Sequence, residues 1–267
     1  MIGPVAKVFR VGKIVSTMTE NFKKFARSIC YGIAPKQVSA LQRYRYLKSE
    51  ARKLNKKTGN LSTHQERFSA VQESPFVTQQ IESEFIQVME KVKSMNPRCV
   101  VEIGAFKGGT LSLFAQMSSP DCRFLSVDIA YRLPEQLALK QLALKNQKIN
   151  CISGDSSASQ TIQKVKQWLR NDQIDVLFID GDHSFNGVKA DFENYSPFVR
   201  PGGLIIFHDI VEDYTTRFGK PTPSYTGGVP RFWNELKALG FSTEEVIADP
   251  SQDGFGIGLM VKAQAGL

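Results

Sequence analysis

The sequence predicts an α/β fold in which a mostly parallel sheet is covered by helices on both faces. From Arg98 onward, short apolar runs without a helical period alternate with amphipathic segments. The first run ends in a glycine-rich turn, and aspartates close several of the later runs. Because parallel strands need crossover connections, this alternation indicates repeated strand–helix–strand units, and ligands bind such sheets beyond the carboxyl ends of the strands.

The expected elements follow from the position of each apolar run and of the turn residues beside it. Upstream of the sheet, helices are expected at 37–57 and 77–92, with a turn at 58–60 and a polar stretch up to Pro75 between them. Strands are expected at 99–103, 124–128, 149–153, 174–180 and 203–208, with helices at 109–118, 134–146, 158–171 and 185–196. A helix at 229–239 and strands at 241–247 and 255–262 complete the chain.

The turn after the first expected strand suits a ligand that contains a nucleoside. Gly104 and Gly108 allow backbone N–H groups to approach a ligand at the start of the following helix. Asp128 closes the next strand, close to the spacing of roughly 20 residues at which an acid meets ribose hydroxyls. These features favour an adenosine-containing ligand.

Two residues of this turn argue against a dinucleotide. Phe106 stands where the dinucleotide fingerprint has its second glycine, so no pyrophosphate seat is evident. Glu102 would repel a pyrophosphate but suits a cationic amino-acid group. S-adenosylmethionine carries an ammonium, a sulfonium, a ribose and an adenine, and it has no phosphate.

The segment Glu102-Ile103-Gly104-Ala105-Phe106-Lys107-Gly108 resembles the first motif of the class I S-adenosylmethionine-dependent methyltransferases, and the resemblance extends over about 98–262. It implies a Rossmann-like, seven-stranded sheet whose last strand, within 254–261, is antiparallel. Gly154-Asp155-Ser156 matches the place where that family contacts adenine. The cofactor residues that the resemblance implies are Glu102, Gly104, Ala105, Phe106, Gly108, Thr110, Asp128, Asp155, Ser156 and Asp180.

His183 is the candidate catalytic base, because it lies three residues after Asp180, where metal-dependent O-methyltransferases similar to catechol O-methyltransferase place a catalytic lysine. Imidazole accepts a hydroxyl proton near neutral pH; a helix-start histidine that only contacts the loop is the alternative. Asp180 and Asp209 align with two metal ligands of that group, but Ile210 occupies the third position. Magnesium would then need Asp182, His208, Glu212 or water, which leaves metal dependence open.

The runs 180–184, 208–209 and 228–233 resemble a narrower branch, the cephalosporin-hydroxylase-like and macrocin-type O-methyltransferases. That resemblance implies a hydroxyl acceptor on a small molecule, a sugar or a glycolipid. The loop 210–228 is the expected substrate lid, with Tyr214, Tyr225 and Trp233 as candidate stacking faces, although each could equally lie in a loop without a substrate role.

Other classes of function stay open at this stage. A nucleic-acid methyltransferase would explain a basic extension, but the fourth strand lacks the Asn/Asp-Pro-Pro-aromatic run used on exocyclic amines, and the chain has no Pro-Cys nucleophile. A non-catalytic scaffold on the same fold and a nicotinamide oxidoreductase are the remaining alternatives. Binding of S-adenosylmethionine separates an enzyme from the scaffold, binding of a nicotinamide cofactor would reveal the oxidoreductase, and methyl label in RNA would reveal the nucleic-acid methyltransferase.

Charge divides the chain into a basic helical extension, 1–75, and a methyltransferase domain, 76–267. Residues 1–60 contain 14 Lys or Arg and 2 acids. Apolar positions from Val5 to Ile29 recur near a helical period, so this helix could pack on the core, on a second copy in a homo-oligomer, on an anionic membrane surface or on a polyanion.

Composition favours a cytoplasmic protein that at most lies on a membrane surface. No apolar run reaches the roughly 18 residues of a membrane span, and no signal segment is evident. The four cysteines, Cys30, Cys99, Cys122 and Cys151, show no Cys-x-x-Cys spacing, which indicates reduced core thiols.

Overall fold

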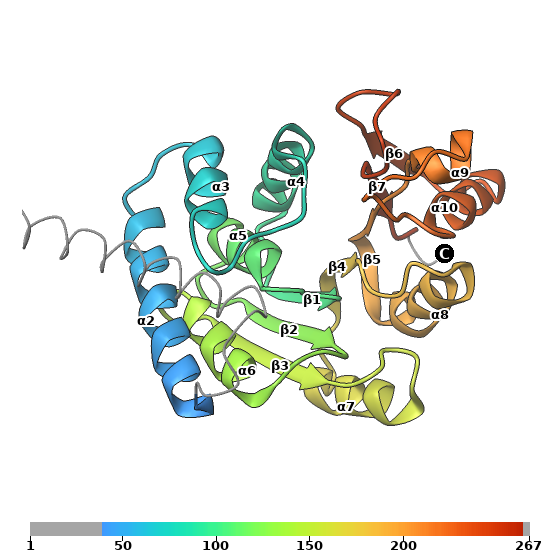
Figure 1. The fold of residues 1–267 in the computed structure, drawn as a ribbon. Helices are drawn as coiled ribbons and strands as arrows, with labels where there is room; N and C mark the ends of the chain where they lie inside the picture. The colour runs from blue at the N-terminus through green and yellow to red at the C-terminus, as the bar shows by residue number, and fades with distance from the viewer. Residues whose placement is uncertain (1–38, 264–267) are drawn as a thin grey trace, which may run out of the picture.

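The computed structural model describes residues 39–263, which form a seven-stranded sheet with helices packed on both faces (Figure 1). The strands are β1 (Cys99–Ile103), β2 (Arg123–Asp128), β3 (Lys148–Ser153), β4 (Ile174–Ile179), β5 (Val199–His208), β6 (Thr243–Val246) and β7 (Ile257–Val261). Their order across the sheet is β3-β2-β1-β4-β5-β7-β6. The chain therefore starts in the middle of the sheet and proceeds first to one edge and then to the other.

The sheet is parallel except at β7. Strands β1 to β5 pair in parallel, whereas β7 is antiparallel to both β5 and β6. The predicted fold class, including the antiparallel last strand, is confirmed.

Helices cover the sheet in two layers, one on each face. Successive side chains along a strand point to opposite faces, so each strand contributes to the apolar core on both sides. One layer holds α2 (Ala40–Thr58), α3 (His64–Gln72), α4 (Glu82–Met95), α5 (Gly109–Met117) and α6 (Leu133–Leu139), and the other holds α7 (Ser159–Leu169), α8 (Phe185–Tyr195) and α10 (Val229–Ala238). Val100 packs in the first core and its neighbour Val101 in the second, as the period of two along a strand requires.

Three elements that precede β3 in the chain differ from the sequence-based expectation. The polar stretch before Pro75 contains α3, whose capping box of Thr63 and Glu66 is a start signal that the expectation passed over. Helix α4 begins at Glu82 and not near 77. The preceding residues 77–80 are not helical; their segment packs closely against the start of α5, where a Cβ on Gly109 would come within 2.3 Å of the Phe76 carbonyl oxygen. Helix α6 ends at Leu139 and continues only as a short 3₁₀ turn, Lys140–Leu142.

Helices α2 and α3 share the core of the sheet. Leu47, Leu54 and Phe68 are buried in the same apolar cluster as Val100 and Phe178. The division at 75/76 into an extension and a domain therefore stays an interpretation from charge, while apolar packing continues across it. The helix expected between Val5 and Ile29, the start of the helix expected at 37, and Cys30 lie outside the described residues.

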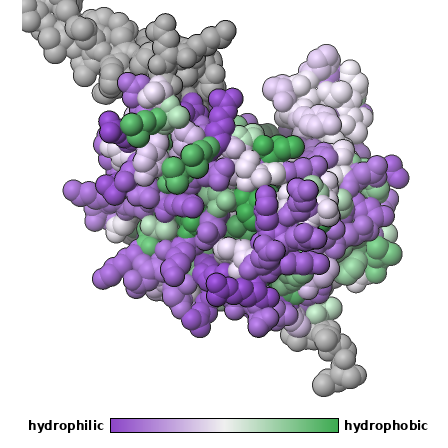
Figure 2. All heavy atoms as spheres, turned by 90° about the horizontal axis from the view of Figure 1, so that it is seen from below, coloured by the Kyte–Doolittle hydropathy of each residue, from purple (hydrophilic) through white to green (hydrophobic). Residues whose placement is uncertain are grey.

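The described residues contain free cysteines and no membrane-spanning helix. Cys99 and Cys122 are buried and Cys151 is half-buried, all as free thiols. Between 39 and 263, no helix is both long and apolar enough to cross a bilayer. Figure 2 shows hydrophilic side chains over most of the face seen from below, with apolar ones in small groups.

Gly258 gives a first testable prediction. It lies on β7 directly under the Trp233 ring, where an added Cβ would come within 2.8 Å of three ring carbons. Trp233 is 1% exposed and donates a hydrogen bond from Nε1 to Glu245, so the ring cannot move away without losing this contact. Gly258→Val is therefore expected to lower the free energy of unfolding by about 2–3 kcal/mol. Urea denaturation measures this. Gly240→Ala, whose added Cβ meets nothing within 4 Å but whose φ of +81° strains an L side chain, shows the smaller loss that backbone strain alone causes, about 1 kcal/mol; equal stability of Gly258→Val and wild type would contradict the packing argument.

Candidate active site

A cavity of about 990 Å³ opens at the carboxyl ends of the central strands. Its walls come from the loops that follow β1 to β5, from the segment before α4, and from the loop 210–228. Ligands are expected at this edge of an open α/β sheet. Six of the ten cofactor residues implied by the sequence line it, namely Gly104, Phe106, Asp128, Asp155, Ser156 and Asp180.

Gly104 can only be glycine, because the ends of β1 and β4 meet at it. Its φ of +79° lies in the left-handed region, and a Cβ there would come within 2.0 Å of the Asp180 carbonyl oxygen. The Asp180 N–H in turn donates to the Ile103 carbonyl oxygen at 2.9 Å. The glycine-rich turn and the fourth-strand aspartate are thus one joined unit.

Asp128 holds the turn that follows β1. Its Oδ2 accepts hydrogen bonds from the N–H groups of Ala105 and Phe106, each at 3.0 Å, and its Oδ1 accepts from the N–H of Ala130 at 2.7 Å. Sequence reasoning assigned this carboxylate to ribose hydroxyls; the structure gives it backbone partners and a place on the cavity wall. A carboxylate oxygen has more than one lone pair, so ribose hydroxyls can still donate to it.

Three residues that line the cavity have positive φ although they are not glycine. They are Phe106 at +48°, Asp209 at +64° and Phe255 at +60°. Such backbone conformations cost about 1–3 kcal/mol each and occur preferentially at functional sites. Their clustering here supports the assignment of the cavity as the site.

Glu102 lies behind the cavity wall and not on it, which corrects its expected role. It is fully buried, accepts a hydrogen bond from the Ser126 hydroxyl at 3.2 Å, and its Oε1 has no partner among the described residues. Burial raises the pKa of this carboxyl well above its ordinary value. Glu102 therefore does not offer an exposed charge to a cationic ligand group in this conformation.

Ala105, Gly108 and Thr110 also lie away from the cavity surface. Ala105 and Thr110 are buried, and the Thr110 hydroxyl shares a hydrogen bond of 2.8 Å with that of Thr78. Gly108, with a φ of +82°, is the residue before α5, and a Cβ there would come within 2.2 Å of Leu139. These three residues shape the turn and seat α5 from behind the wall.

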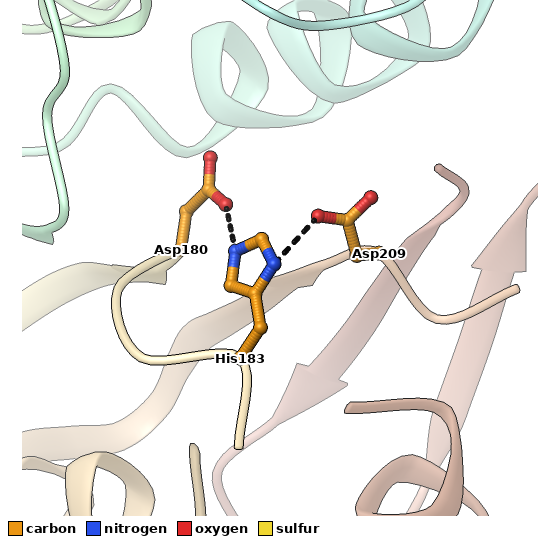
Figure 3. Close-up of side chains that lie close together, drawn as sticks. All are labelled: Asp180, His183 and Asp209. Atoms are coloured by element: carbon orange, nitrogen blue, oxygen red, sulfur yellow. Dashed lines mark hydrogen bonds and ion pairs between the residues drawn. The ribbon is translucent and has the colours of Figure 1, made fainter. Parts of the chain in front are cut away.

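The other end of the cavity holds two aspartates around an imidazole. Asp180, His183 and Asp209 each offer a ligand atom within 4.8 Å of the other two. Figure 3 shows the imidazole of His183 between the two carboxylates, with Nε2 at 3.4 Å from Asp180 Oδ1 and Nδ1 at 3.5 Å from Asp209 Oδ2. His208 brings a second imidazole, whose Nδ1 lies 3.2 Å from each of the same two oxygens.

Opposite charges in this cluster shift the pKa values of its members. Burial lowers the pKa of His183, but the hydrogen bond that its ring donates to Asp180 and the charges of Asp209 and Asp180 raise it to about 9. Burial opposes ionisation of Asp180, but His208 and His183 lower its pKa to about 2. His208 is also buried, and the two aspartates raise its pKa well above the ordinary value. In the absence of a cation, the imidazoles are held protonated between the carboxylates.

The donor set of this cluster fits a divalent cation. Two carboxylates and an imidazole within ligating distance of one another are a common first-row metal set, and the Nδ1 of His208 faces the same two carboxylate oxygens. Because imidazole suits Mn²⁺, Fe²⁺ or Zn²⁺ better than Mg²⁺, which prefers oxygen ligands, the set fits Mg²⁺ less well.

The expected lid is anchored at both of its ends. The Asp213 carboxylate accepts from the N–H groups of Thr216 and Thr226, and the His183 Nδ1 contacts the Tyr225 carbonyl oxygen at 2.8 Å. The Tyr225 ring is 69% exposed, lines the cavity and stacks on His183 with centroids 6.1 Å apart. Trp233 is buried against β7, so the expectation that it offers a stacking face to a substrate is wrong. Tyr214 lies on the short helix α9 (Tyr214–Phe218) and does not line the cavity.

Several cavity residues were missed by sequence reasoning. Gln79, Gln80 and Ile81 line the cavity from the segment expected to be helical, and Gln80 Nε2 donates to Asp180 Oδ2 at 3.3 Å. No sequence signal marks this segment. Phe255 was assigned to a strand, but the glycines on both sides of it are a turn signal that was available.

Residues 101–210 match the family model of a methyltransferase domain. This segment is a methyltransferase domain. The domain begins within β1 and ends just past Asp209, so it contains the glycine-rich turn, Asp128 and the cluster of Asp180, His183 and Asp209. The predicted resemblance to the class I methyltransferases is confirmed over this segment by the match, and the strand order agrees with it.

Solved methyltransferases share the fold of this domain. One from Bacillus cereus in complex with S-adenosylhomocysteine is 19% identical, with a TM-score of 0.53 over 81% of this chain and 90% of that one. MycE, a methyltransferase of mycinamycin biosynthesis solved with Mg, S-adenosylhomocysteine and mycinamycin VI, is 18% identical, with a TM-score of 0.51 over 76% of this chain and 55% of that one.

Among curated sequences, an uncharacterised protein of Acanthamoeba polyphaga mimivirus is 33% identical over 125 residues. These residues are 43% of this chain and 52% of the viral protein, so the match spans about half the length of each.

Proposed function

We propose that this chain is an S-adenosylmethionine-dependent O-methyltransferase that acts on a hydroxyl group of a small molecule, a sugar or a glycolipid. One observation carries the proposal: a single cavity joins the turn held by Asp128 to the cluster of Asp180, His183 and Asp209. The first end suits a nucleoside without phosphate, and the second suits an acceptor hydroxyl that must lose a proton. The solved O-methyltransferase from Bacillus cereus, which shares the fold, supports the same proposal.

The cavity has room for a donor and an acceptor together. Its volume of about 990 Å³ lies at the upper end of the roughly 300–1,000 Å³ usual for small-molecule sites. Methyl transfer is a displacement in line with the sulfur, so both ligands must be held in one enclosed space with fixed geometry. The exposed Tyr225 ring beside His183 offers a flat apolar surface, which suits a sugar or an aromatic acceptor.

At the cluster, Asp180 and Asp209 would hold a divalent cation, and His183 would take the acceptor proton. A bound cation lowers the pKa of the acceptor hydroxyl and, by repulsion, that of the neighbouring imidazole. His183 Nδ1 is oriented by the Tyr225 carbonyl, which leaves Nε2 as the nitrogen that faces Asp180 and the cavity. For His183 to act as the base, the imidazole ligand must be His208.

Calorimetry with S-adenosylmethionine and S-adenosylhomocysteine tests the donor half of the proposal. Saturable binding of both at micromolar concentration is expected, and NAD⁺ is expected to give no heat. Incubation with methyl-labelled donor and a panel of sugars, glycolipid precursors, catechols and RNA tests the acceptor half. A protein that binds neither donor ligand would be a scaffold, and label in RNA alone would overturn the hydroxyl acceptor.

Paired histidine variants separate the ligand from the base. His208→Gln is expected to weaken Mn²⁺ binding by about tenfold or more, since it removes a nitrogen donor. His183→Gln is expected to keep Mn²⁺ binding but to lower kcat by about 10²-fold, the usual contribution of a general base. Electron paramagnetic resonance measures free Mn²⁺, and initial rates give kcat. If His183→Gln loses Mn²⁺ and His208→Gln does not, His183 is the ligand and the base lies elsewhere.

A further inference from the structure

The outward face of α2 carries a row of cations, here called the basic stripe, that have no acid partners. Its members recur every three or four residues and are Arg45, Lys48, Arg52 and Lys56. Three of them are exposed, and Lys48 is half-buried. Within residues 39–263, none of the four forms an ion pair, whereas the other basic residues of α2 all pair with glutamates. The basic stripe is therefore a surface of uncompensated positive charge.

The packing of α2 keeps the basic stripe turned away from the core. Leu47, Ala51 and Leu54 are buried on the opposite side of the helix, in the core that α2 shares with the sheet. Asn55 Nδ2 donates to the Gln141 carbonyl oxygen at 2.9 Å, which fixes the rotation of the helix about its axis. Figure 1 shows α2 at the outer edge of the described part of the chain. The basic stripe therefore faces outward in the folded protein.

The arrangement of these cations fits a partner that carries phosphate groups. Lys48, Arg52 and Lys56 are four residues apart in turn, and like charges at this spacing destabilise a helix. The stripe, together with Ser49 and Lys53, lines a hollow of about 370 Å³. Guanidinium forks and ammonium groups bind phosphate oxygens through charge-assisted hydrogen bonds. Phosphates in this hollow would relieve the repulsion that the helix otherwise bears.

Three features favour an anionic bilayer over a nucleic acid as the source of these phosphates. Leu41, which is 54% exposed, lies on the same helix face at one end of the stripe, where it can enter the apolar part of a membrane interface. The residues before Ser39 combine lysine, arginine and apolar residues with Glu20 as their one acid, a composition typical of membrane-surface segments. The Tyr44 ring already lies under the Lys48 ammonium, 5.4 Å away, so it is not free to stack on a base.

We propose that the basic stripe docks this protein on an anionic membrane surface, with its cations on lipid phosphates and Leu41 in the interface. The hollow at the stripe and the 990 Å³ cavity share no lining residue, so docking through α2 does not need to cover the candidate active site. The proposal goes beyond the proposed function and does not rest on it, because a vesicle surface can bind the stripe without a methyl donor or acceptor.

Co-sedimentation of the full chain with vesicles tests the docking. The protein is expected to sediment with vesicles of phosphatidylserine and phosphatidylcholine and to stay in solution with vesicles of phosphatidylcholine alone. Raising NaCl from about 0.1 M to about 1 M shortens the Debye length from about 10 Å to about 3 Å, so it is expected to release the protein.

Two quadruple variants with equal net charge separate the basic stripe from charge in general. The first neutralises the stripe with Arg45→Gln, Lys48→Gln, Arg52→Gln and Lys56→Gln. Each cation close to an anionic surface contributes about fivefold in affinity, so partitioning onto the vesicles is expected to fall by about 10²-fold or more. The control neutralises surface cations that pair with acids, through Lys57→Gln, Lys91→Gln, Arg98→Gln and Lys189→Gln. It is expected to change partitioning by less than about threefold.

Thermal unfolding shows that a loss of binding is not a loss of fold. The stripe variant is expected to have the Tm of the wild type or a slightly higher one, because it removes like charges that are neighbours on the helix. Its affinity for S-adenosylhomocysteine is expected to match that of the wild type, since none of the four residues lines the cavity.

The remaining outcomes would overturn the docking. They are a stripe variant that sediments like the wild type, equal losses in the two quadruple variants, and wild-type binding that does not depend on phosphatidylserine. Fluorescence anisotropy with a labelled RNA hairpin provides the other arm: binding of the hairpin by a protein that binds no vesicle would assign the stripe to a nucleic acid. A protein that docks on vesicles but binds neither S-adenosylmethionine nor S-adenosylhomocysteine would overturn the proposed function alone.

Discussion

Replacing Asp180 with asparagine is expected to lower kcat/KM for methyl transfer by about 10²- to 10³-fold. Asp180 Oδ1 faces both imidazoles, with His183 Nε2 at 3.4 Å and His208 Nδ1 at 3.2 Å, and Oδ2 accepts from Gln80. One substitution therefore removes the charge that a cation and both histidines share. Initial rates with labelled donor measure the loss, and Mn²⁺ titration is expected to show loss of the cation site as well.

The same variant is expected to change the affinity for S-adenosylhomocysteine by less than about threefold, because Asp128 and the glycine-rich turn are untouched. Asp172→Asn serves as the control, since Asp172 is an exposed aspartate paired with Arg123 on the surface. Wild-type turnover by Asp180→Asn would remove the cluster from the mechanism.

Asp128→Asn is expected to raise the dissociation constant of S-adenosylhomocysteine by about 10²-fold. Both carboxylate oxygens of Asp128 accept hydrogen bonds, from three backbone N–H groups in all. Asparagine has one acceptor oxygen, and its other terminal group is an N–H₂ donor. One of these N–H groups would face the amide N–H₂, so the turn after β1 would lose its fixed shape. The carboxylate available to ribose hydroxyls is lost at the same time.

Calorimetry gives the affinity of Asp128→Asn, and circular dichroism checks that the sheet is intact. Asp155→Asn is a matched comparison on the same cavity wall: Asp155 caps only its own turn, through Ser157, so its effect is expected to be about tenfold smaller. Equal affinities of Asp128→Asn and wild type would show that the turn keeps its shape without the carboxylate.

The order of strands and helices after Arg98 could be predicted because each buried strand is an apolar run that a turn residue ends. The first five strands begin within one residue of expectation, except β5, which begins at Val199 because the residues of the Pro-Gly-Gly turn, 201–203, already belong to the strand. Helix α3 was missed because only nine residues form it and its apolar positions are few.

The candidate site was predictable in part, for a similar reason. Residues that follow strands, such as Asp128, Asp180 and Asp209, are placed by the sheet itself, and the sequence shows where strands end. The inward direction of Glu102 depends on which face of β1 it occupies, and a five-residue strand that is buried throughout gives no alternation to read. Gln80 and Tyr225 reach the cavity from segments without regular spacing, so only the folded chain brings them there.

The joint core of α2, α3 and the sheet has a practical consequence for handling this protein. A fragment that begins at residue 76, where the charge pattern suggests a boundary, would lack the apolar side chains of α2 and α3 that cover Phe85 and its neighbours. The apolar surface exposed in this way would favour aggregation. Expression trials that aim at a minimal soluble enzyme should therefore retain the chain from Ser39 onward.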